Sequence, residues 1–188
     1  MKLYALCDQS TLDKKHYTLE AFVDLCNRYD AQIIQYRNKS GDLDFITEQL
    51  KALRALWSKT LIINDAFALH TFCDGVHLGQ EDLYKVDRDP VTALKQIRSA
   101  IGKEKLIGLS THNLQEIDQA NRLDLDYIGL GAYRATSTKE DAAPLREQLD
   151  LLAAHSKHPV AAIGGVRFDD VFENVTYRVI SSALYEEN

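Results

Sequence analysis

Short apolar runs alternate with longer polar segments along the whole chain. Each run has the length of a buried strand and stops abruptly at polar side chains or glycine, as the strands of a parallel sheet do. The runs predict eight strands, at residues 3–6, 32–36, 60–63, 75–78, 106–109, 127–130, 160–163 and 178–180.

The segments between the runs carry apolar residues at helical spacing. In the segment 18–29, for example, Leu19, Phe22, Val23 and Cys26 fall on one helical face. The periodicity predicts helices at residues 18–29, 45–57, 66–72, 90–100, 113–122, 144–155 and 168–172. Strands that alternate with helices in this way indicate a parallel sheet. Eight such units favour a closed (β/α)8 TIM barrel in the α/β class, and an open doubly wound sheet is the alternative.

The length of the chain limits this barrel. Such barrels typically need about 250 residues, whereas this chain has 188. We therefore expect a compact barrel with shortened helices and minimal loops, in which the third and seventh predicted helices, 66–72 and 168–172, are the weakest. No linker or low-complexity segment interrupts the pattern, so we expect residues 1–188 to form one domain.

Composition and charge narrow the classes of function. The chain has 22 basic and 28 acidic residues and a net charge of −6. It carries no basic run, so we expect no nucleic-acid surface. The first apolar run is too short for a signal peptide, and no run is long enough to span a membrane. Cys7, Cys26 and Cys73 share no metal or redox spacing, so we expect free thiols in a reducing cytoplasm.

Two acids follow neighbouring predicted strands. Asp65 and Asp82 each come a few residues after an apolar run, and the carboxyl ends of parallel strands are where ligands bind in such folds. Two carboxylates with amide neighbours suit Mg²⁺ when a phosphate supplies the other ligands. The alternative is that Asn64 and Asp65 cap a helix and that Glu81 and Asp82 form a solvated turn.

Cations gather at the end of the second predicted strand. Gln35, Arg37 and Lys39 are two residues apart, so they fall on one face of the strand. If that face points into the barrel mouth, the guanidinium and the ammonium converge there and a bound anion is expected. The alternative is a strand that runs out into a solvated turn at residues 38–41.

Three later segments also suit phosphate. Thr136, Ser137, Thr138 and Lys139 offer hydroxyls, amides and an ammonium, although the P-loop spacing is absent. The pairs 164–165 and 181–182 follow the last two strands, where barrels of this class frequently bind phosphate with the help of a short helix, here expected near 182–187. The diglycine could instead form only a tight turn.

Two histidines lie within or next to predicted strands. His77 stands inside an apolar strand, where a hydrogen-bonded core residue is the commoner outcome. His112 follows a strand end, where barrel sites gather, so a chemical role is more readily expected of it. Their spacing to the acids matches no zinc motif.

Several segments, in order along nearly the whole chain, resemble thiamine phosphate synthases and the related thiazole tautomerases. The run Gly-Val-His-Leu-Gly-Gln-Glu-Asp at 75–82 is the most specific. The others lie at 35–39, 63–65, 108–112, 126–129, 136–139 with Asp141, 162–165 and 180–181. This resemblance implies a Mg²⁺-dependent transferase that joins hydroxymethylpyrimidine diphosphate to a thiazole phosphate carboxylate. The products would be thiamine phosphate, pyrophosphate and carbon dioxide, and the partners only small molecules.

The resemblance also implies roles for single residues. Asp65 and Asp82 would hold Mg²⁺ on the diphosphate, and Gln35 would help to set the pyrimidine. The residues on the diphosphate or its pyrophosphate product would be Arg37, Lys39, Asn64, Ser110 and Lys139, all but Asn64 with a part in catalysis. The residues on the thiazole substrate would be Thr136 and Thr138 near its carboxylate and Gly165, Ile180 and Ser181, through backbone groups, at its phosphate.

Two alternatives remain open within the same resemblance. A thiazole tautomerase would use a histidine at the position of His112, but such proteins tend to lose the metal and diphosphate residues that this chain keeps. A catalytically weak member would only bind a thiamine precursor or a partner protein. The eroded seventh helix and the short last loop, between Gly165 and Ile180, favour it somewhat. The loop 132–135, which reads Ala-Tyr-Arg-Ala where the family commonly has Pro and Phe, is a further departure that bears on the thiazole end of the site.

Overall fold

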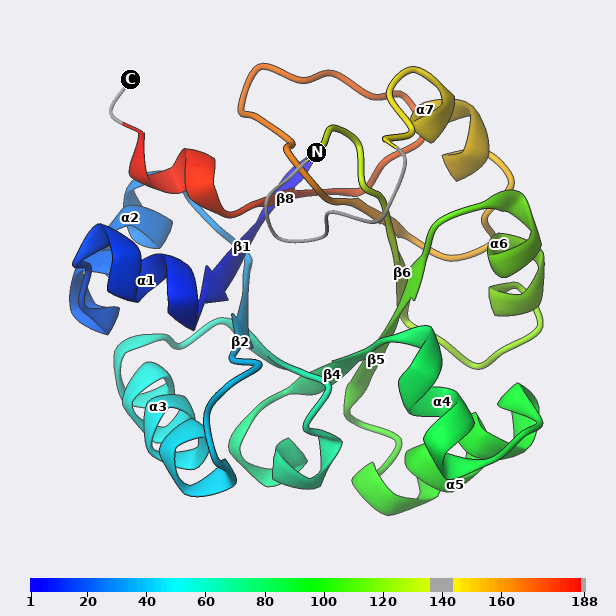
Figure 1. Cartoon of the computed structure of the whole chain (residues 1–188), viewed down its shortest axis with the longest axis horizontal. Coiled ribbons are helices and arrows are strands. Elements are labelled where there is room, and N and C mark those ends of the chain that lie inside the picture. The colour runs from blue at the N-terminus through cyan, green and yellow to red at the C-terminus, as the bar shows by residue number, and fades with distance from the viewer. Residues whose placement is uncertain (136–143, 187–188) are drawn as a thin grey trace.

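The strands of the chain close into one parallel barrel, seen end-on in Figure 1. The computed structural model describes residues 1–135 and 144–186. β1 pairs with both β2 and β8, so the sheet has no open edge. The strands are β1 (Lys2–Asp8), β2 (Ile33–Arg37), β3 (Thr60–Asn64), β4 (Gly75–Leu78), β5 (Leu106–Thr111), β6 (Tyr127–Leu130), β7 (Val160–Ala162) and β8 (Tyr177–Ile180). The predicted barrel is confirmed, and the open-sheet alternative is wrong.

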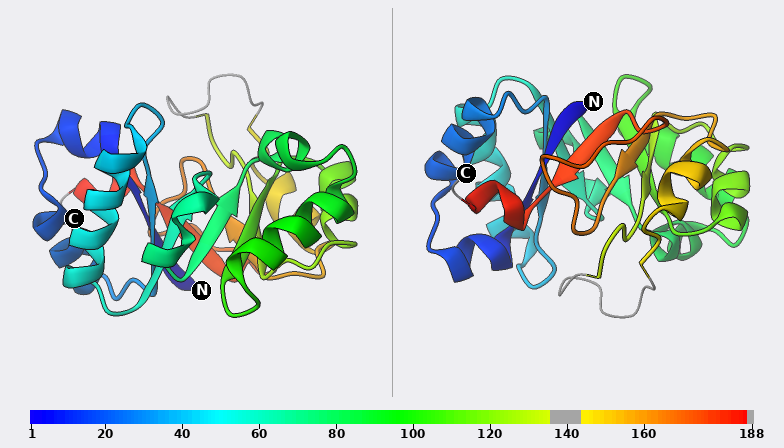
Figure 2. Two further views of the ribbon diagram at one scale, coloured as in Figure 1. Left: turned by 90° about the horizontal axis from the view of Figure 1, so that it is seen from below. Right: turned by 90° about the horizontal axis from the view of Figure 1, so that it is seen from above.

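Helices surround the strands, and the side views in Figure 2 show them packed around the outside of the barrel. The helices are α1 (Gln9–Lys15), α2 (Leu19–Arg28), α3 (Leu43–Leu56), α4 (Gln80–Val86), α5 (Pro90–Ile101), α6 (Leu114–Ala120) and α7 (Gln148–Ala153), with the 3-10 helices η1 (Phe67–Phe72) and η2 (Ser182–Tyr185). No helix in the described part of the chain is long and apolar enough to cross a membrane.

The hydrophobic pattern missed two helices, α1 and α4. Each has seven residues and begins directly after a strand. Seven residues make only two turns, and α1 buries a single apolar residue, Leu12, so neither helix shows a readable period. Both are started by an acid instead: Asp8 accepts a hydrogen bond from the Thr11 N–H, and Asp82 accepts one from the Gly79 N–H.

The last third of the chain is less helical than predicted. The helix expected at 144–155 forms only as α7, and Pro144 lies outside it. The helix expected at 168–172 does not form, because polar contacts fold the segment as a turn. Asp170 accepts from the Arg167 N–H, and Arg178 donates to the carbonyls of Phe168 and Asp170. The third predicted helix, 66–72, forms only as the 3-10 helix η1. The third and seventh predicted helices are therefore the weak elements, as expected.

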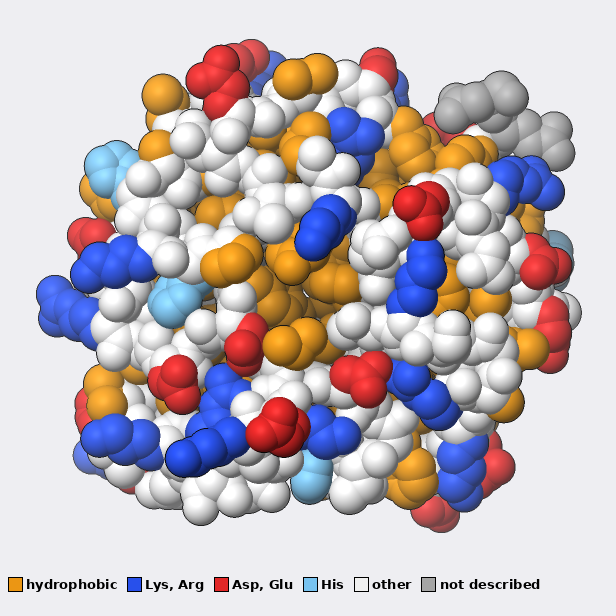
Figure 3. All heavy atoms as spheres, turned by 180° about the vertical axis from the view of Figure 1, so that it is seen from behind, with side chains coloured by type: hydrophobic (Ala, Val, Ile, Leu, Met, Phe, Trp, Pro, Cys, Tyr) orange, Lys and Arg blue, Asp and Glu red, His pale blue; other side chains and the backbone are white. Residues whose placement is uncertain are grey.

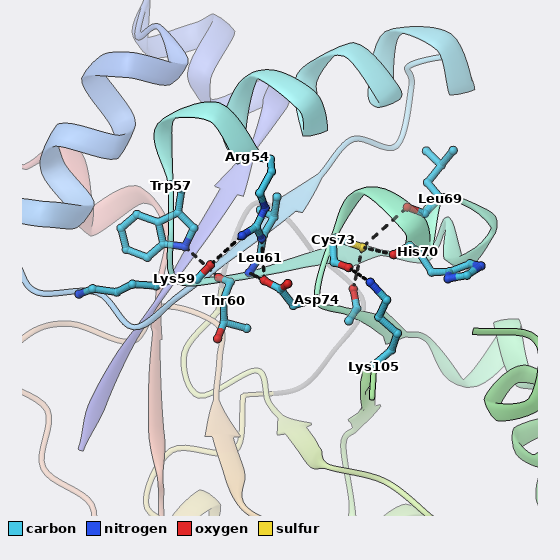
Figure 4. A network of polar contacts seen from close by, with 11 residues as sticks. Arg54, Trp57, Lys59, Thr60, Leu61, Leu69, His70, Cys73, Asp74 and Lys105 are labelled. Carbon is cyan, nitrogen blue, oxygen red and sulfur yellow. Dashed lines mark hydrogen bonds and ion pairs between the residues drawn. The ribbon is translucent and has the colours of Figure 1, made fainter. Parts of the chain in front are cut away.

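At the amino ends of the strands, one arrangement occurs twice. Arg54 in the last turn of α3 binds Asp74, whose carboxylate also accepts the Leu61 N–H at 2.8 Å (Figure 4). Arg98 of α5 binds Asp126, which accepts the Ile107 N–H at 2.7 Å. Each pair ties a helix end to the start of a neighbouring strand. Figure 3 looks onto this end of the barrel, where apolar side chains lie in the centre with charged groups around them. This face supports stability, whereas ligands bind at the opposite one.

The barrel interior holds aromatic rings that depend on glycine. A small cluster inside the barrel includes Tyr4, Leu6, Ile62 and Tyr127. Gly108 of β5 is the register partner of Tyr127, and a Cβ atom on Gly108 would lie 2.2 Å from Cζ of that ring. Because protein interiors are close-packed, the ring can occupy this position only beside a glycine.

Replacing this glycine tests the packing. Gly108→Ala should lower the free energy of unfolding by about 1–3 kcal/mol, since overpacking a filled core has that cost. Urea denaturation would measure the change. In a Tyr127→Leu background the ring is gone, so the same substitution should cost clearly less. Equal losses in the two backgrounds would show that the ring is not what excludes the methyl group.

Candidate active site

A cavity of about 430 Å³ lies at the carboxyl ends of the strands. Its walls come from strand ends and from the loops that follow β6, β7 and β8. The predicted site residues that line it are Gln35, Arg37, Asn64, Ser110, Gly165 and Ser181, with His77 and His112. The volume falls in the usual range for small-molecule sites. The rule that polar strand ends meet at one mouth therefore brought residues from six strands or their loops into one place.

Some predicted residues lie elsewhere. Lys39 is exposed in the turn after β2, where the Asn38 Oδ1 atom accepts the N–H groups of Ser40 and Gly41. Lys39 therefore lies on the solvated turn and does not line the cavity, although its charge still acts on Asp65. The Ile180 side chain is fully buried, so only its backbone can face a ligand. Thr136, Thr138 and Lys139 lie outside the described residues.

Arg37 is held by an acid that the sequence analysis missed. Asp8 at the end of β1 is 2% exposed and forms an ion pair with Arg37. It also accepts hydrogen bonds from Ser10 Oγ at 2.7 Å and Thr11 Oγ1 at 3.1 Å. Burial raises the pKa of Asp8, but the Ser10 hydrogen bond and the Arg37 charge outweigh it and hold the pKa below its usual value. The anion that balances Arg37 within the chain is therefore Asp8, and it fixes the guanidinium at the cavity wall.

Asp65 and Asp82 lie beside each other at this end of the barrel, within reach of the charges of Lys39 and Arg37, but neither is among the residues that line the cavity. Asp82 is 9% exposed and accepts from the Gly79 N–H and from Lys85 Nζ, both at 2.9 Å. Burial raises the pKa of Asp65 to about 6, and the charge of Asp82 and a hydrogen bond with it act in the same direction. Two carboxylates this close resist being ionised together unless a cation joins them.

Neither acid takes the arrangement that the alternative interpretation gave it. η1 has no side-chain cap, so Asn64 and Asp65 do not cap a helix. Asp82 is buried, so it is not part of a solvated turn. Within residues 1–135 and 144–186, no group of three or more acids, histidines or cysteines could hold a metal ion. A cation at the two carboxylates would thus need further ligands from a substrate, which is how Mg²⁺ is commonly bound.

The loops after β6 and β7 form the other wall. Gly164 and Gly165 have φ values of 87° and 67°, so the diglycine does make a tight turn. Arg134 crosses this turn, donating to the Gly165 carbonyl at 2.7 Å and holding Asp170 by two bonds of 2.6 Å. Arg167 lines the cavity from the same loop and is exposed. Neither Arg134 nor Arg167 was a predicted site residue. The sequence gives no local sign of the role of Arg134, because its contacts lie more than 30 residues away along the chain.

His112 lines the cavity on a third side. Its Nδ1 atom lies 2.8 Å from Glu116 Oε2, and its backbone N–H donates to the same oxygen. Burial raises the pKa of Glu116, but the His112 hydrogen bond and charge outweigh it and lower the pKa overall. The imidazole is therefore fixed at the edge of the cavity by Glu116 of α6, the helix that follows it.

Removing one of the paired carboxylates should stabilise the chain. The pKa of Asp65 is raised from 3.8 to about 6, so the folded protein keeps a proton that the unfolded chain has lost. Stability therefore falls as pH rises between about 4 and 6 and stays lower above that range. Asparagine has no carboxylate to ionise, so the Asp65→Asn variant does not lose this stability as pH rises. Asparagine also tolerates the left-handed backbone at φ 62°.

We expect Asp65→Asn to gain about 1 kcal/mol at pH 7.5, allowing for solvent screening of a half-buried group, and almost nothing at pH 4. Urea denaturation at both pH values would measure the gain. Asp118→Asn, which removes an exposed carboxylate of α6, is the control and should change little. An Asp65→Asn gain that is the same at both pH values would contradict the raised pKa.

Comparison with known proteins places the chain in a family. The family model described as thiamine monophosphate synthase matches residues 3–186. The thiamine-phosphate synthase of Lawsonia intracellularis is 34% identical over 192 residues, which cover 98% of this chain and 83% of that protein. The one from Persephonella marina is 34% identical over 172 residues, covering 88% of this chain and 77% of the relative.

A solved structure is similar over the same extent. Thiamine phosphate pyrophosphorylase from Pyrococcus furiosus aligns with a TM-score of 0.76 at 26% identity, covering 97% of this chain and 86% of that one. The match of the family model over almost the whole chain, the two relatives and the shared barrel agree with the resemblance in the sequence. The chain belongs to the thiamine monophosphate synthase family.

Proposed function

We propose that this chain couples hydroxymethylpyrimidine diphosphate to thiazole phosphate carboxylate, giving thiamine phosphate, pyrophosphate and carbon dioxide. The observation that carries the proposal is the carboxylate pair Asp65–Asp82. The charges of Lys39 and Arg37 reach Asp65, and Arg37 also lines the cavity. A diphosphate with Mg²⁺ suits this arrangement, because the metal joins the acids to an anion that the basic residues also attract. The named relatives, which are thiamine-phosphate synthases, support the same activity.

Asp65 and Asp82 would hold Mg²⁺, which supplies positive charge on the diphosphate as it departs. The raised pKa of Asp65 supports this role, since a bound cation removes the repulsion that keeps the proton in place. Arg37 and Asn64 line the cavity next to this pair. Together with Lys39, Ser110 and Lys139 they would stabilise the charge that develops on the leaving group.

The reaction needs no nucleophilic side chain. The bond between the pyrimidine methylene and the diphosphate breaks, and its electron pair leaves with pyrophosphate. The thiazole ring nitrogen then forms the new bond to the methylene. The carboxylate is lost as carbon dioxide, and the electron pair left on the ring carbon takes up a proton from water. The protein's contribution is to orient the two substrates, to neutralise the leaving group and to keep water from the cation-like carbon.

The thiazole phosphate would lie at the other end of the cavity. Gly165, Ser181 and the exposed Arg167 line that end. Backbone N–H groups of Gly165, Ile180 and Ser181 would bind phosphate oxygens, and Thr136 and Thr138 the carboxylate. Arg167 would add a positive charge next to a connection that is shorter than is usual in the family.

Tautomerisation of the thiazole is the second candidate, because His112 lines the same cavity and is fixed by Glu116. Mere binding of a thiamine precursor or of a partner protein is the third. The three cysteines are buried free thiols, which supports the proposal of a reducing, cytoplasmic location.

One assay separates these functions. The purified chain with both substrates and Mg²⁺ should form thiamine phosphate and an equal amount of pyrophosphate. Asp82→Ala should lower kcat/KM by 100-fold or more, because it removes half of the metal site, whereas Asp118→Ala should change it less than twofold. Isomerised thiazole without coupling would support the tautomerase, and calorimetric binding without any product would support the binding protein. Either result would contradict the synthase.

Arg167 allows a test of the thiazole end alone. Arg167→Ala should raise the KM for thiazole phosphate carboxylate about 10- to 100-fold, since a charge-assisted hydrogen bond has about that strength. The KM for the pyrimidine diphosphate should stay the same. Arg88→Ala, which removes an exposed arginine away from the cavity lining, is the control. If the thiazole alcohol, which lacks the phosphate, lost affinity equally, Arg167 would not be a phosphate ligand.

A further inference from the structure

Five polar side chains form one continuous hydrogen-bonded path across the inside of the barrel, here called the tyrosine relay. Gln35 Nε2 donates to the Tyr4 hydroxyl at 3.0 Å, and the hydroxyls of Tyr4 and Tyr127 are 2.8 Å apart. The Tyr127 hydroxyl lies 3.0 Å from His77 Nδ1, and His77 Nε2 lies 3.0 Å from Ser110 Oγ. The five residues come from five different strands, β2, β1, β6, β4 and β5 in that order.

Two glycines make room for this relay, because a side chain at either position would clash with it. Tyr4, Tyr127 and His77 are 1%, 3% and 7% exposed. Besides Gly108, which makes space for the Tyr127 ring, Gly129 lies against His77, and a Cβ atom there would come within 2.9 Å of the imidazole Cε1. Buried polar groups are costly unless they are hydrogen-bonded, and here every link has a partner.

The donors in the relay fix its direction. An amide nitrogen can only donate, so the Tyr4 oxygen accepts from Gln35. The Tyr127 oxygen is the other partner of the Tyr4 hydroxyl among the described residues, so we assign the Tyr4 proton to that bond. The Tyr127 O–H then donates to His77 Nδ1, which leaves the imidazole proton on Nε2. His77 Nε2–H donates to Ser110 Oγ. Burial raises the pKa of both tyrosine hydroxyls, so they stay protonated and can donate.

Both ends of the relay face the substrate cavity. Gln35 and Ser110 line it, whereas Tyr4 and Tyr127 do not. With the amide nitrogen engaged by Tyr4, Gln35 presents its carbonyl oxygen, an acceptor that suits the amino group of an aminopyrimidine. With its oxygen accepting from His77, Ser110 presents its O–H as a donor. A diphosphate oxygen can only accept, so this polarity is the one that such a ligand requires.

We infer that Tyr127, together with Tyr4, is a positioning residue for the pyrimidine diphosphate: through the relay it fixes the Nε2–H form of His77 and so sets an acceptor at Gln35 and a donor at Ser110. The ligand identity rests on the proposed function. The hydrogen-bonded path itself does not rest on the proposed function, because all of its bonds join residues of this chain. The tyrosines act on the substrate only through the members of the relay that line the cavity, which are Gln35, His77 and Ser110.

A matched pair of variants tests the inference. Tyr127→Phe removes one link and leaves the ring. Tyr177→Phe removes a hydroxyl from a ring that packs edge-on against both Tyr4 and Tyr127, with centroids 6.3 Å away, but makes no hydrogen bond in the described part of the chain. We expect Tyr127→Phe to weaken pyrimidine diphosphate about tenfold in KM and in calorimetric Kd, with an unchanged KM for the thiazole substrate. Tyr177→Phe should change both less than twofold.

A spectroscopic measurement reads the relay without turnover. In ¹⁵N-histidine-labelled protein at pH 8, the signals of His77, assigned by their loss in His77→Gln, should report a protonated Nε2 and an unprotonated Nδ1. Tyr127→Phe should shift them towards a mixture of the two forms, while Tyr177→Phe should leave them in place. A chain that makes no thiamine phosphate but shows these signals would contradict the proposed function and not the relay. Protonated Nδ1 in the unaltered protein, or equal effects of the two variants on pyrimidine binding, would overturn the inference.

Discussion

The repulsion between the half-buried carboxylate of Asp65 and the buried carboxylate of Asp82 is the interaction on which the rest of the site depends. Nothing in the folding of the barrel requires these acids to meet, and their proximity opposes stability above the raised pKa of Asp65. Asp65 also occupies a left-handed backbone conformation that most residues avoid. Unfavourable features of this kind persist at functional sites when a ligand makes use of them. A divalent cation shared with a diphosphate would turn the repulsion into attraction.

Two acids of the site, Asp8 and Asp82, also start helices that cover the barrel. Asp8 caps α1 while it holds Arg37, and Asp82 caps α4 while it faces Asp65. In a chain of 188 residues the loops after these strands have almost no length. One carboxylate must therefore serve both the helix start and the site. Helix capping thus fixes the position of charges that the proposed chemistry needs, and the short chain keeps them rigid.

How far the sequence could predict this structure depends on how local each signal is. The eight strands and the longer helices follow from periodicity within a few residues, and the rule on strand ends was enough to gather Gln35, Arg37 and Asn64. Ser110 was named only through the family resemblance. The same rule, applied to the first strand, would also have found Asp8. It could not show that Lys39 is exposed, because β2 ends at Arg37 and the turn at Asn38 begins before the alternation of strand faces extends to Lys39.

Contacts between distant strands carry no such signal. Tyr4 and Tyr127 are 123 residues apart, and they meet only because the barrel closes. The two arginines of the β6 and β7 loops likewise act across the fold. The turn at 168–170 replaced a predicted helix because Arg134 and Arg178 bind it from outside its own segment. Single-sequence reasoning thus recovers strands and their ends well, and recovers poorly what the closed barrel brings together across its interior and its mouth.

The most direct test of this account is a crystal structure of the chain with Mn²⁺, in place of Mg²⁺, and pyrophosphate, with the metal located by its anomalous scattering. The account predicts a metal ion bound by carboxylate oxygens of both Asp65 and Asp82, with pyrophosphate oxygens completing its coordination and Arg37 in contact with the same anion. Pyrophosphate bound in the cavity with no metal at either carboxylate, or a metal held at another place, would contradict it.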